Sequence, residues 1–286
     1  MAKILIKIVV TDATTKRPIA GVKLNIIGAH GERLETTSDP KGLASLQLPN
    51  PGTIHIAART AEYPEQQTAV LVPPNQSKPI ELALHPRKNV FFAIYYRVPD
   101  NAFGRAAKTW ADELNGGNPR FRLGRDVVKL IEADTEAAFK QAWSAVDAEG
   151  QLPGREVVEG RLFTHASKGE GNDGLEFRPG QGDDGTIGNV ELMTLNRLKW
   201  ARDGLLVMHG CNTGTGGSRG WAPAGSIASA QGIATVGQKG YSYFSANPAR
   251  YEEINAGSPR VYLWAYRRNR NGVLGGGERI EAVTYR

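Results

Sequence analysis

Residues 205–214 read LLVMHGCNTG, an apolar run that ends in a turn of small residues. A short continuous apolar run bounded by turn residues is typical of a strand buried on both faces of a sheet. The turn contains Cys211, the single cysteine of the chain. One thiol forms neither an internal disulfide nor a cysteine-rich metal site, so Cys211 is either a buried filler or a nucleophile. Its place just past an expected strand, at the start of a Gly-rich loop, favours the nucleophile.

The residues on either side of this stretch alternate between strand and helix patterns. The apolar run at 90–96 predicts a second strand buried on both faces. Alternation of this kind over residues 87–286 predicts an α/β domain with a mostly parallel sheet flanked by helices. Further strands are expected at 126–132, 156–164, 204–208 and 233–236, and helices at 101–114, 135–146, 194–201 and 225–232.

Residues 1–86 have a different character and predict a small all-β sandwich. Short, partly alternating segments rich in β-branched residues are separated by Gly, Pro and Asp turns. His30, His55 and His85 fall here without the convergent spacing of a metal site, so no metal ion is expected. The expected strands lie at 3–11, 21–28, 44–48, 53–58, 68–72 and 79–84.

Three segments of this region resemble transthyretin-like domains of the carboxypeptidase-regulatory-like or Cna-B-like kind. They are TDATTKRPIAGV at 11–22, TSDPKG at 37–42 and LPNPG at 48–52. The resemblance implies a β-sandwich fold. It implies little about function, because such sandwiches serve as spacers, adhesion modules and docking units.

The net charge is +6 and the pI is near 9.4, but the basic residues are scattered except for RRNR at 267–270. We interpret them as an ordinary solvated surface and expect no nucleic-acid partner. The Gly-rich runs at 214–217 and 275–277 lack the phosphate-loop pattern, and no cofactor is expected. No stretch is apolar enough to span a membrane, and the first ten residues do not form a signal peptide. We therefore expect cytoplasmic synthesis, with any export independent of the usual signal.

Two reactive side chains stand at the ends of expected strands. His165 follows the strand at 156–164, and Cys211 follows the strand at 204–208. Active residues of open α/β sheets gather beyond the carboxyl ends of the strands, so the two side chains meet if these strands are neighbours. A Cys–His pair supplies a thiolate nucleophile and the base that removes and returns its proton.

From Lys88 onward the chain resembles the caspase-like fold, which includes caspases, metacaspases, gingipains, separases and bacterial CHAT domains. The resemblance is carried by LLVMHGCNTG, by the short helix VELMTLNRL at 190–198 that leads into it, and by His165, 46 residues before Cys211. It implies a clan CD cysteine peptidase with a His165–Cys211 dyad, which cleaves a protein or peptide substrate through a thioester acyl-enzyme. The backbone N–H groups of Cys211 and Ala166 would form the oxyanion hole, although the family usually has Gly where this chain has Ala166.

Several alternatives stay open at this level. His209 would point to the same face as Cys211 if the strand continued, so it could replace His165 as the base or pack beneath the site. The acidic, Gly-rich loop at 167–188 could cover the site, be cut on activation, or simply be exposed, and Asp183 or Asp184 could recognise a basic substrate residue.

The rival functions are a non-catalytic caspase-like interaction module and a cell-wall amidase with the same dyad. The absence of a signal together with the appended sandwich is also what a bacterial effector would have. Such an effector would be exported by a contact-dependent machine and would meet a secretion-machine or immunity partner.

Overall fold

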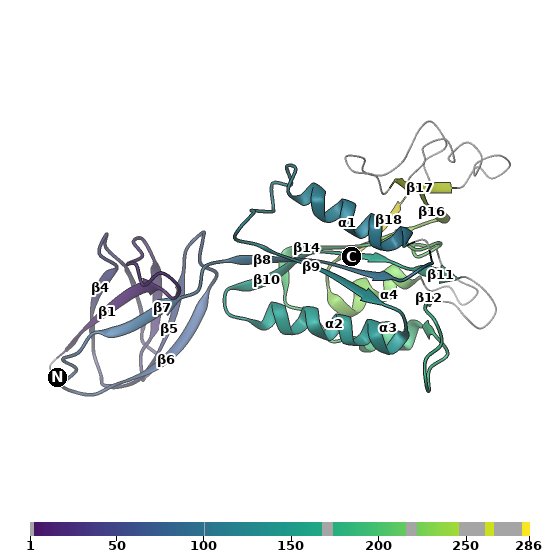
Figure 1. The fold of residues 1–286 in the computed structure, drawn as a ribbon. Helices are drawn as coiled ribbons and strands as arrows, with labels where there is room; N and C mark the ends of the chain where they lie inside the picture. The colour runs from purple at the N-terminus through teal and green to yellow at the C-terminus, as the bar shows by residue number, and fades with distance from the viewer. Residues whose placement is uncertain (1–2, 100, 168–173, 216–221, 246–260, 266–281) are drawn as a thin grey trace. The chain divides into compact units, whose positions relative to one another are not determined.

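The computed structural model describes residues 3–99, 101–167, 174–215, 222–245, 261–265 and 282–286 (Figure 1). The chain divides into two compact units, Met1–Lys88 and Asn89–Arg286; the expected boundary lay after residue 86. The first unit is all β, and the second is a mostly parallel sheet with flanking helices, as the sequence predicts. The basic cluster at 267–270 lies outside the described residues.

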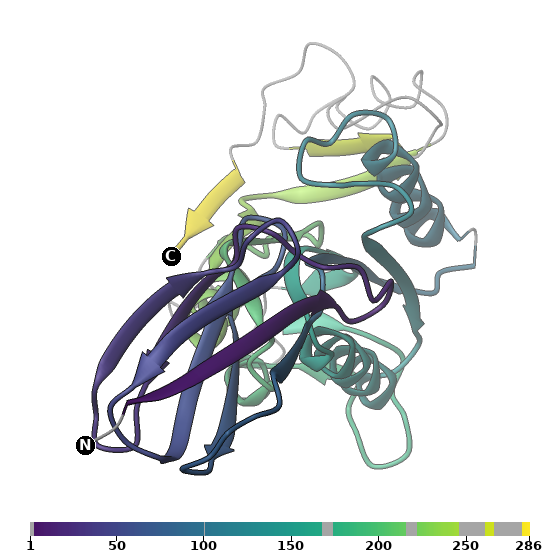
Figure 2. The same cartoon turned by 90° about the vertical axis from the view of Figure 1, so that its left-hand side faces the viewer.

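The first unit consists of two sheets with a common core (Figure 2). All of their strand pairs are antiparallel except that of β1 (Ile4–Asp12) with β7 (Ile80–Leu84), which is parallel. Apolar and outward-facing residues alternate along its strands: in β1, the apolar side chains of residues 4, 6, 8 and 10 are buried, and those between them face outward. Buried Ile and Leu side chains of both sheets fill the space between them. One sheet has the order β4-β1-β7, from β1 (Ile4–Asp12), β4 (Leu43–Leu48) and β7 (Ile80–Leu84); the other has the order β3-β2-β5-β6, from β2 (Lys23–Ile27), β3 (Arg33–Thr37), β5 (Gly52–Arg59) and β6 (Gln66–Val72).

The turn predicted at 38–42 is built by Asp39 and Gly42. The Asp39 carboxylate accepts hydrogen bonds from the backbone N–H groups of Lys41 and Leu43. Gly42 has a φ of +72°, and a Cβ there would lie 2.5 Å from the carbonyl oxygen of Val10. No other residue type fits this position without displacing β1. Strand β3 was missed because its RLETT sequence has one apolar residue and lies at a sheet edge.

The second unit is built on a six-stranded sheet with the order β18-β15-β14-β10-β8-β9. The pairs β8–β9, β10–β14 and β14–β15 are parallel, and the edge strand β18 is antiparallel to β15. The predicted strands and most helices are confirmed with shifts of a few residues at their ends. The confirmed strands are β8 (Lys88–Tyr96), β9 (Val127–Ala133), β10 (Arg155–Phe163), β14 (Trp200–Met208) and β15 (Ala234–Gln238). The edge strand β18 (Ala282–Tyr285) was not predicted.

Helix α1 (Ala102–Leu114) covers one face of this sheet, and α2 (Glu136–Gln151), α3 (Asn189–Thr194) and α4 (Pro223–Gln231) cover the other (Figure 1). Thr135 caps α2 as predicted, because its hydroxyl accepts a hydrogen bond from the Ala138 N–H. In the centre of the sheet Gly160 of β10 has no room for a side chain: a Cβ would lie 2.4 Å from Phe92 and 2.7 Å from Leu206. The sheet is therefore packed at close range where β10 runs between β8 and β14.

The prediction of a helix at 194–201 is wrong. The helix here is α3, which ends at Thr194, and Trp200 already belongs to β14. Gln231 of α4 holds the extended connection, because its side-chain oxygen accepts hydrogen bonds from the Leu198 N–H and from Trp200 Nε1. This partner lies more than 30 residues away along the chain, so no local pattern signals it.

The prediction of one loop at 167–188 also needs correction. It contains β12 (Gly174–Glu176) and β13 (Thr186–Ile187), which form a small antiparallel sheet with β11 (His165–Ser167). Residues 168–173 between β11 and β12 lie outside the described residues. A two-stranded sheet of β16 (Tyr241–Ser245) and β17 (Val261–Ala265) completes the unit. Among the described residues, no helix is long and apolar enough to cross a bilayer.

Candidate active site

His165 and Cys211 follow adjacent strands at equivalent positions. Strands β10 and β14 are parallel neighbours, and their last paired residues are Leu162 and Met208. His165 and Cys211 each stand three residues further on. The condition set by the sequence, that the two strands be neighbours, is therefore met, and both residues lie beyond the carboxyl ends of the same sheet.

Gly210 brings the two strand ends into close contact. A Cβ on Gly210 would lie 3.0 Å from the Thr164 carbonyl oxygen and 3.1 Å from Ala166 Cβ. Thr164 and Ala166 flank His165, and Gly210 directly precedes Cys211. The missing side chain at Gly210 thus lets the backbone that holds the thiol approach the backbone that holds the imidazole.

The turn that holds Cys211 is fixed at several points. Asn212 has a φ of +55°, a left-handed conformation that is uncommon outside glycine. Its N–H donates to the Gly240 carbonyl, and the Thr213 hydroxyl donates to the Gly210 carbonyl at 3.0 Å and accepts from the Gln238 N–H. The left-handed residue is therefore held by contacts to β15 and the segment after it, as expected for a constrained turn after a strand.

The Cys211 thiol is half-buried and faces the backbone of β16. The Ser242 N–H donates to Cys211 Sγ at 3.3 Å, and Sγ lies 3.6 Å from the Ser242 carbonyl oxygen, which accepts from the thiol. Burial raises the pKa of the thiol, the Ser242 N–H opposes this in part, and the charge of Glu176 raises it further. In the described part of the chain the thiol bonds to Ser242 and not to His165.

His165 packs edge-on against two aromatic rings and stays open to solvent on another side. Its ring centroid lies 4.9 Å from that of Phe103 in α1 and 5.8 Å from that of Tyr96 in β8. Burial by these rings lowers the pKa of His165, while the charge of Glu176 opposes the shift. The imidazole is therefore held mainly in its neutral form near neutral pH, which is the form that accepts a proton.

Glu176 belongs to this site, although the sequence analysis did not select it as a candidate. It lies directly across from His165 in the antiparallel pair of β11 and β12. Its carboxylate influences the pKa values of both His165 and Cys211, so its charge reaches both groups. The sequence shows Glu176 only as one acidic residue of an expected loop, and the hairpin register that brings it opposite His165 has no local signal.

His209 lies on the face of the sheet that α1 covers. Its ring stacks on Phe163, with centroids 4.5 Å apart and planes 7° apart, and its Nε2 lies 3.3 Å from Arg161 Nη1. Burial, and then the Arg161 charge, hold its pKa well below the usual range. Arg161 is always protonated, so Nε2 accepts this hydrogen bond. The sequence left two roles open for His209, a replacement for His165 as the base or a group that packs beneath the site. Its stacking on Phe163 agrees with the second role.

The remaining predicted site residues have structural partners. Ala166 is buried in β11, where its Cβ faces Gly210. The Asp183 carboxylate accepts from the N–H groups of Gly180 and Gly185, and that of Asp184 accepts from the Thr186 N–H. These bonds shape the connection between β12 and β13. In the described part of the chain no three His, Cys, Asp or Glu side chains are grouped so that they could hold a metal ion.

Comparison with known proteins adds little to this geometry. No family model and no curated protein matches the chain. Among solved structures, the chain is similar to the Bacillus anthracis TIE protein, with 16% sequence identity and a TM-score of 0.27. The match covers 32% of this chain and 19% of that one, and likeness at this level carries no argument about function.

Proposed function

We propose that this protein is a cysteine-dependent hydrolase of peptide bonds, with Cys211 as the nucleophile and His165 as the base. The observation that carries the proposal is the equivalent placement of the two residues beyond adjacent parallel strands. The constrained turn at Asn212 supports it, because left-handed non-glycine residues cluster at functional sites. The resemblance to caspase-like peptidases agrees with the order of the two residues along the chain.

The resting dyad consists of a thiol and a neutral imidazole, because burial raises the pKa of Cys211 and lowers that of His165. In the proposed reaction Sγ attacks the carbonyl carbon of the scissile bond, and His165 takes the thiol proton. The tetrahedral intermediate collapses, the C–N bond breaks, and His165 returns the proton to the leaving amine. Water then attacks the thioester with His165 as base, which releases the acid and restores the thiol.

This mechanism requires the thiol to turn from Ser242 toward His165. Rotation about the Cα–Cβ bond exchanges staggered rotamers at small cost, and catalytic hydrogen bonds are often formed only when substrate binds. The N–H groups of Cys211 and Ala166 are the proposed donors to the oxyanion of the intermediate. Loss of one such donor typically raises the barrier by about 3 kcal/mol.

Glu176 is proposed as a positioning residue for the base. A carboxylate across the strand pair from His165 stabilises the imidazolium that forms when the thiol is deprotonated. Glu176 acts through His165, so its loss should change the pH dependence of the reaction more than the binding of substrate.

One observation favours a second candidate function, a non-catalytic interaction module. The thiol is half-buried, has a raised pKa and is bonded to the backbone of Ser242. A cysteine held permanently in this way would be a filler, and the unit would then act by binding alone.

Labelling of the thiol by iodoacetamide distinguishes the two functions. For an active dyad we expect stoichiometric labelling of the native protein at pH 7.5 and a rate at least ten-fold lower in His165→Ala, because the base is lost. His55→Ala, which removes an exposed histidine of the first unit, is the matched control and should label like the unaltered chain. Labelling that requires denaturant would contradict the enzyme and favour the interaction module.

Cleavage of a peptide library then tests the reaction itself. We expect turnover by the unaltered chain and none by Cys211→Ala. Suppose that iodoacetamide labels Cys211 at a rate that depends on His165, but no peptide is cleaved. That result would contradict a general peptidase and favour the cell-wall amidase, whose substrates are glycopeptides.

A further inference from the structure

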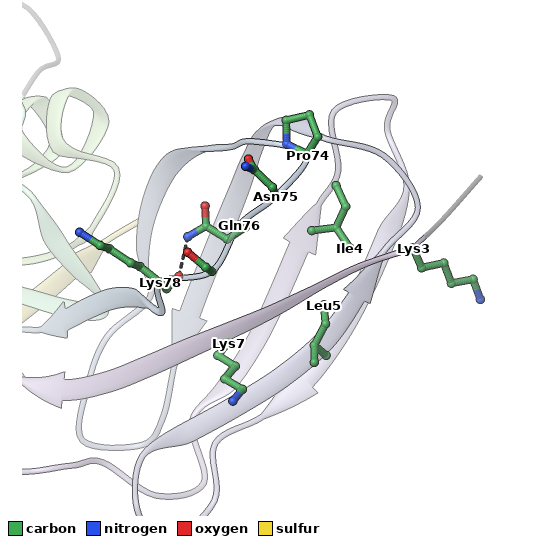
Figure 3. Close-up of a pocket in the computed structure, with 9 residues that line it drawn as sticks. Lys3, Ile4, Leu5, Lys7, Pro74, Asn75, Gln76 and Lys78 are labelled. Carbon is green, nitrogen blue, oxygen red and sulfur yellow. Dashed lines mark hydrogen bonds between the residues drawn. The ribbon is translucent and has the colours of Figure 1, made fainter.

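The first unit contains a groove along the initial part of β1. The groove has a volume of about 350 Å³ and lies between residues 3–7 and residues 74–78 (Figure 3). Lys3, Lys7 and Lys78 line it, together with amide and apolar side chains, and none of the lining residues is acidic. The groove belongs wholly to the first unit, and it shares no residue with the proposed active site.

The backbone of β1 is open along this groove. The Val10 N–H donates to Gly42 beside β4, and the Ala13 N–H donates to Leu84 at the end of β7. Because the groups of successive residues alternate between the two sides of a strand, the N–H and C=O groups of Leu5 and Lys7 face the β7 side. Strand β7 begins at Ile80 and pairs with β1 from Ile8 onward. In a parallel ladder this first pair joins the Ile80 N–H to the Lys7 carbonyl, so β7 leaves the Lys7 N–H and both backbone groups of Leu5 unreached.

The chain's own continuation does not close this edge. One more step of the parallel ladder would join the Lys7 N–H to the Lys78 carbonyl, but this bond is not formed, and the Lys78 carbonyl accepts from the Gln76 side chain at 2.5 Å. Within the described residues, no hydrogen bond joins the Leu5 or Lys7 N–H to residues 73–79. The edge therefore presents two unpaired donors, the N–H groups of Leu5 and Lys7, and one unpaired acceptor, the Leu5 carbonyl, and an added strand uses groups of these kinds.

We propose that this edge of β1 binds an extended acidic segment of a partner protein by strand addition. The outward face of the edge reads Lys3, Leu5, Lys7, with Leu5 54% exposed, so the complementary strand carries acidic residues on either side of an apolar one. Opposite charges directly across a strand pair are stabilising. The same edge of a second copy would place lysines against lysines, and this like-charge contact disfavours self-pairing.

The arrangement of the lysines favours an extended ligand over a compact anion. In Figure 3 the side chains of Lys3, Lys7 and Lys78 point in different directions and do not converge on one point. An extended segment along this edge passes Lys3 and Lys7, which alternate with Leu5 on the outward face of β1. Main-chain hydrogen bonds to Leu5 and Lys7 provide affinity, and the lysines select acidic sequences.

The test uses the full chain and a fluorescein-labelled peptide of alternating Glu and Val, followed by anisotropy. We expect binding that weakens with salt, and slower hydrogen exchange at the Leu5 and Lys7 amides when peptide is present. Reversal of all three groove charges, in Lys3→Glu/Lys7→Glu/Lys78→Glu, should weaken binding about ten-fold or more. Lys23→Glu, a charge reversal on the other sheet, is the matched control and should leave binding unchanged.

A second pair of variants tests the backbone contribution. Leu5→Pro removes one N–H from the open edge and should abolish protection of Lys7, whereas Leu5→Thr keeps that N–H and should bind. Circular dichroism establishes that each variant is folded. Equal binding of an acidic peptide interrupted by prolines would overturn strand addition. So would binding of anionic vesicles or of an oligonucleotide without binding of the alternating peptide.

Discussion

At the scale of single residues, three charged or polarisable groups decide the chemistry of the candidate site. Burial pushes the pKa of Cys211 up and that of His165 down, so both shifts favour the uncharged pair. Glu176 acts on both groups and is the only one of the three that the sequence did not select. Under the proposed function the two residues would therefore act as a general-base pair, with proton transfer during attack, and not as a preformed ion pair.

Glu176→Gln should change the titration of His165. The negative charge of Glu176 raises the pKa of His165, so its removal lowers that pKa and moves the acid limb of kcat/KM to lower pH. The rate on the plateau should fall about ten-fold, since the imidazolium loses its partner. NMR titration of His165 measures the first effect without substrate. Glu35→Gln, in the first unit, is the control, and an unchanged His165 titration would contradict the role given to Glu176.

Glu113 of α1 provides a second residue-scale prediction. Burial raises its pKa to about 7, with Arg161 opposing and Asp112 adding to the shift. In the described structure neither carboxyl oxygen has a hydrogen-bond partner. Between the usual value of 4.5 and about 7 the folded chain binds more protons than the unfolded chain, so this group makes stability fall as pH rises through that window.

Glu113→Gln should therefore flatten the pH dependence of stability. Urea unfolding at pH 4.5 and pH 8, followed by tryptophan fluorescence, should show that the variant gains stability relative to the unaltered chain at the higher pH. A difference between the two proteins that does not vary with pH would show that the carboxyl group titrates normally.

At the scale of elements, the site depends on how closely β10 and β14 approach at their ends. The two strand ends come closest at Gly210. A Cβ there would lie 3.0–3.1 Å from its nearest neighbouring atoms, which is a close contact that small shifts can relieve. The neighbouring turn is tied to β15, because the Gly214 N–H donates to the Gln238 carbonyl, and to β18, because the Tyr285 hydroxyl donates to the Gly214 carbonyl. An added methyl group must therefore displace the His165 segment or the Thr213 side chain of the turn, whose Cγ2 would also lie 3.0 Å away.

Gly210→Ala should reduce activity far more than stability. A shift of a few tenths of an ångström between the thiol and the base should lower kcat about ten-fold or more, whereas overpacking at this point should cost about 1 kcal/mol of unfolding free energy. Gly116→Ala, where the added Cβ meets only an ordinary contact at 3.4 Å, is the control. Equal losses of activity in the two variants would contradict the role of Gly210.

At the scale of the whole molecule, the chain has two units with separate cores. The core of the first unit contains only residues before Asn89, and the two clusters of the second unit contain only residues after it. Each core is made of buried side chains that contact one another, so damage to one is expected to stay within it.

Ile56→Ala tests this separation. Ile56 is fully buried in β5, so its truncation should destabilise the first unit by about 3 kcal/mol. The rate at which iodoacetamide labels Cys211 should stay unchanged at temperatures where the second unit is folded. Val146→Ala, in the core of the second unit, should instead alter both stability and labelling. A labelling rate that changes with Ile56→Ala would show that the two units fold as one.

Hydrophobic pattern and turn chemistry alone determined most of the architecture. Alternation built the sandwich, continuous apolar runs identified the buried strands, and Thr135 and the turn at 38–42 were located by local chemistry. The prediction of a helix at 194–201 was wrong, because the end of this segment is held extended by Gln231, which is distant in the chain. Strand β3 was missed because it lies exposed at a sheet edge. Local patterns report burial and backbone preference, and they do not report partners far away in the chain.

The sequence also supplied Cys211 and His165, through residue type and position after strands. Only the tertiary structure decided that β10 and β14 are neighbours, that His209 lies beneath the site on Phe163, and that Glu176 faces His165. It alone left the edge of β1 open beside three lysines. The physical reason is the same in each case: side chains meet through strand order and register, which depend on pairing between segments that no single stretch of sequence encodes.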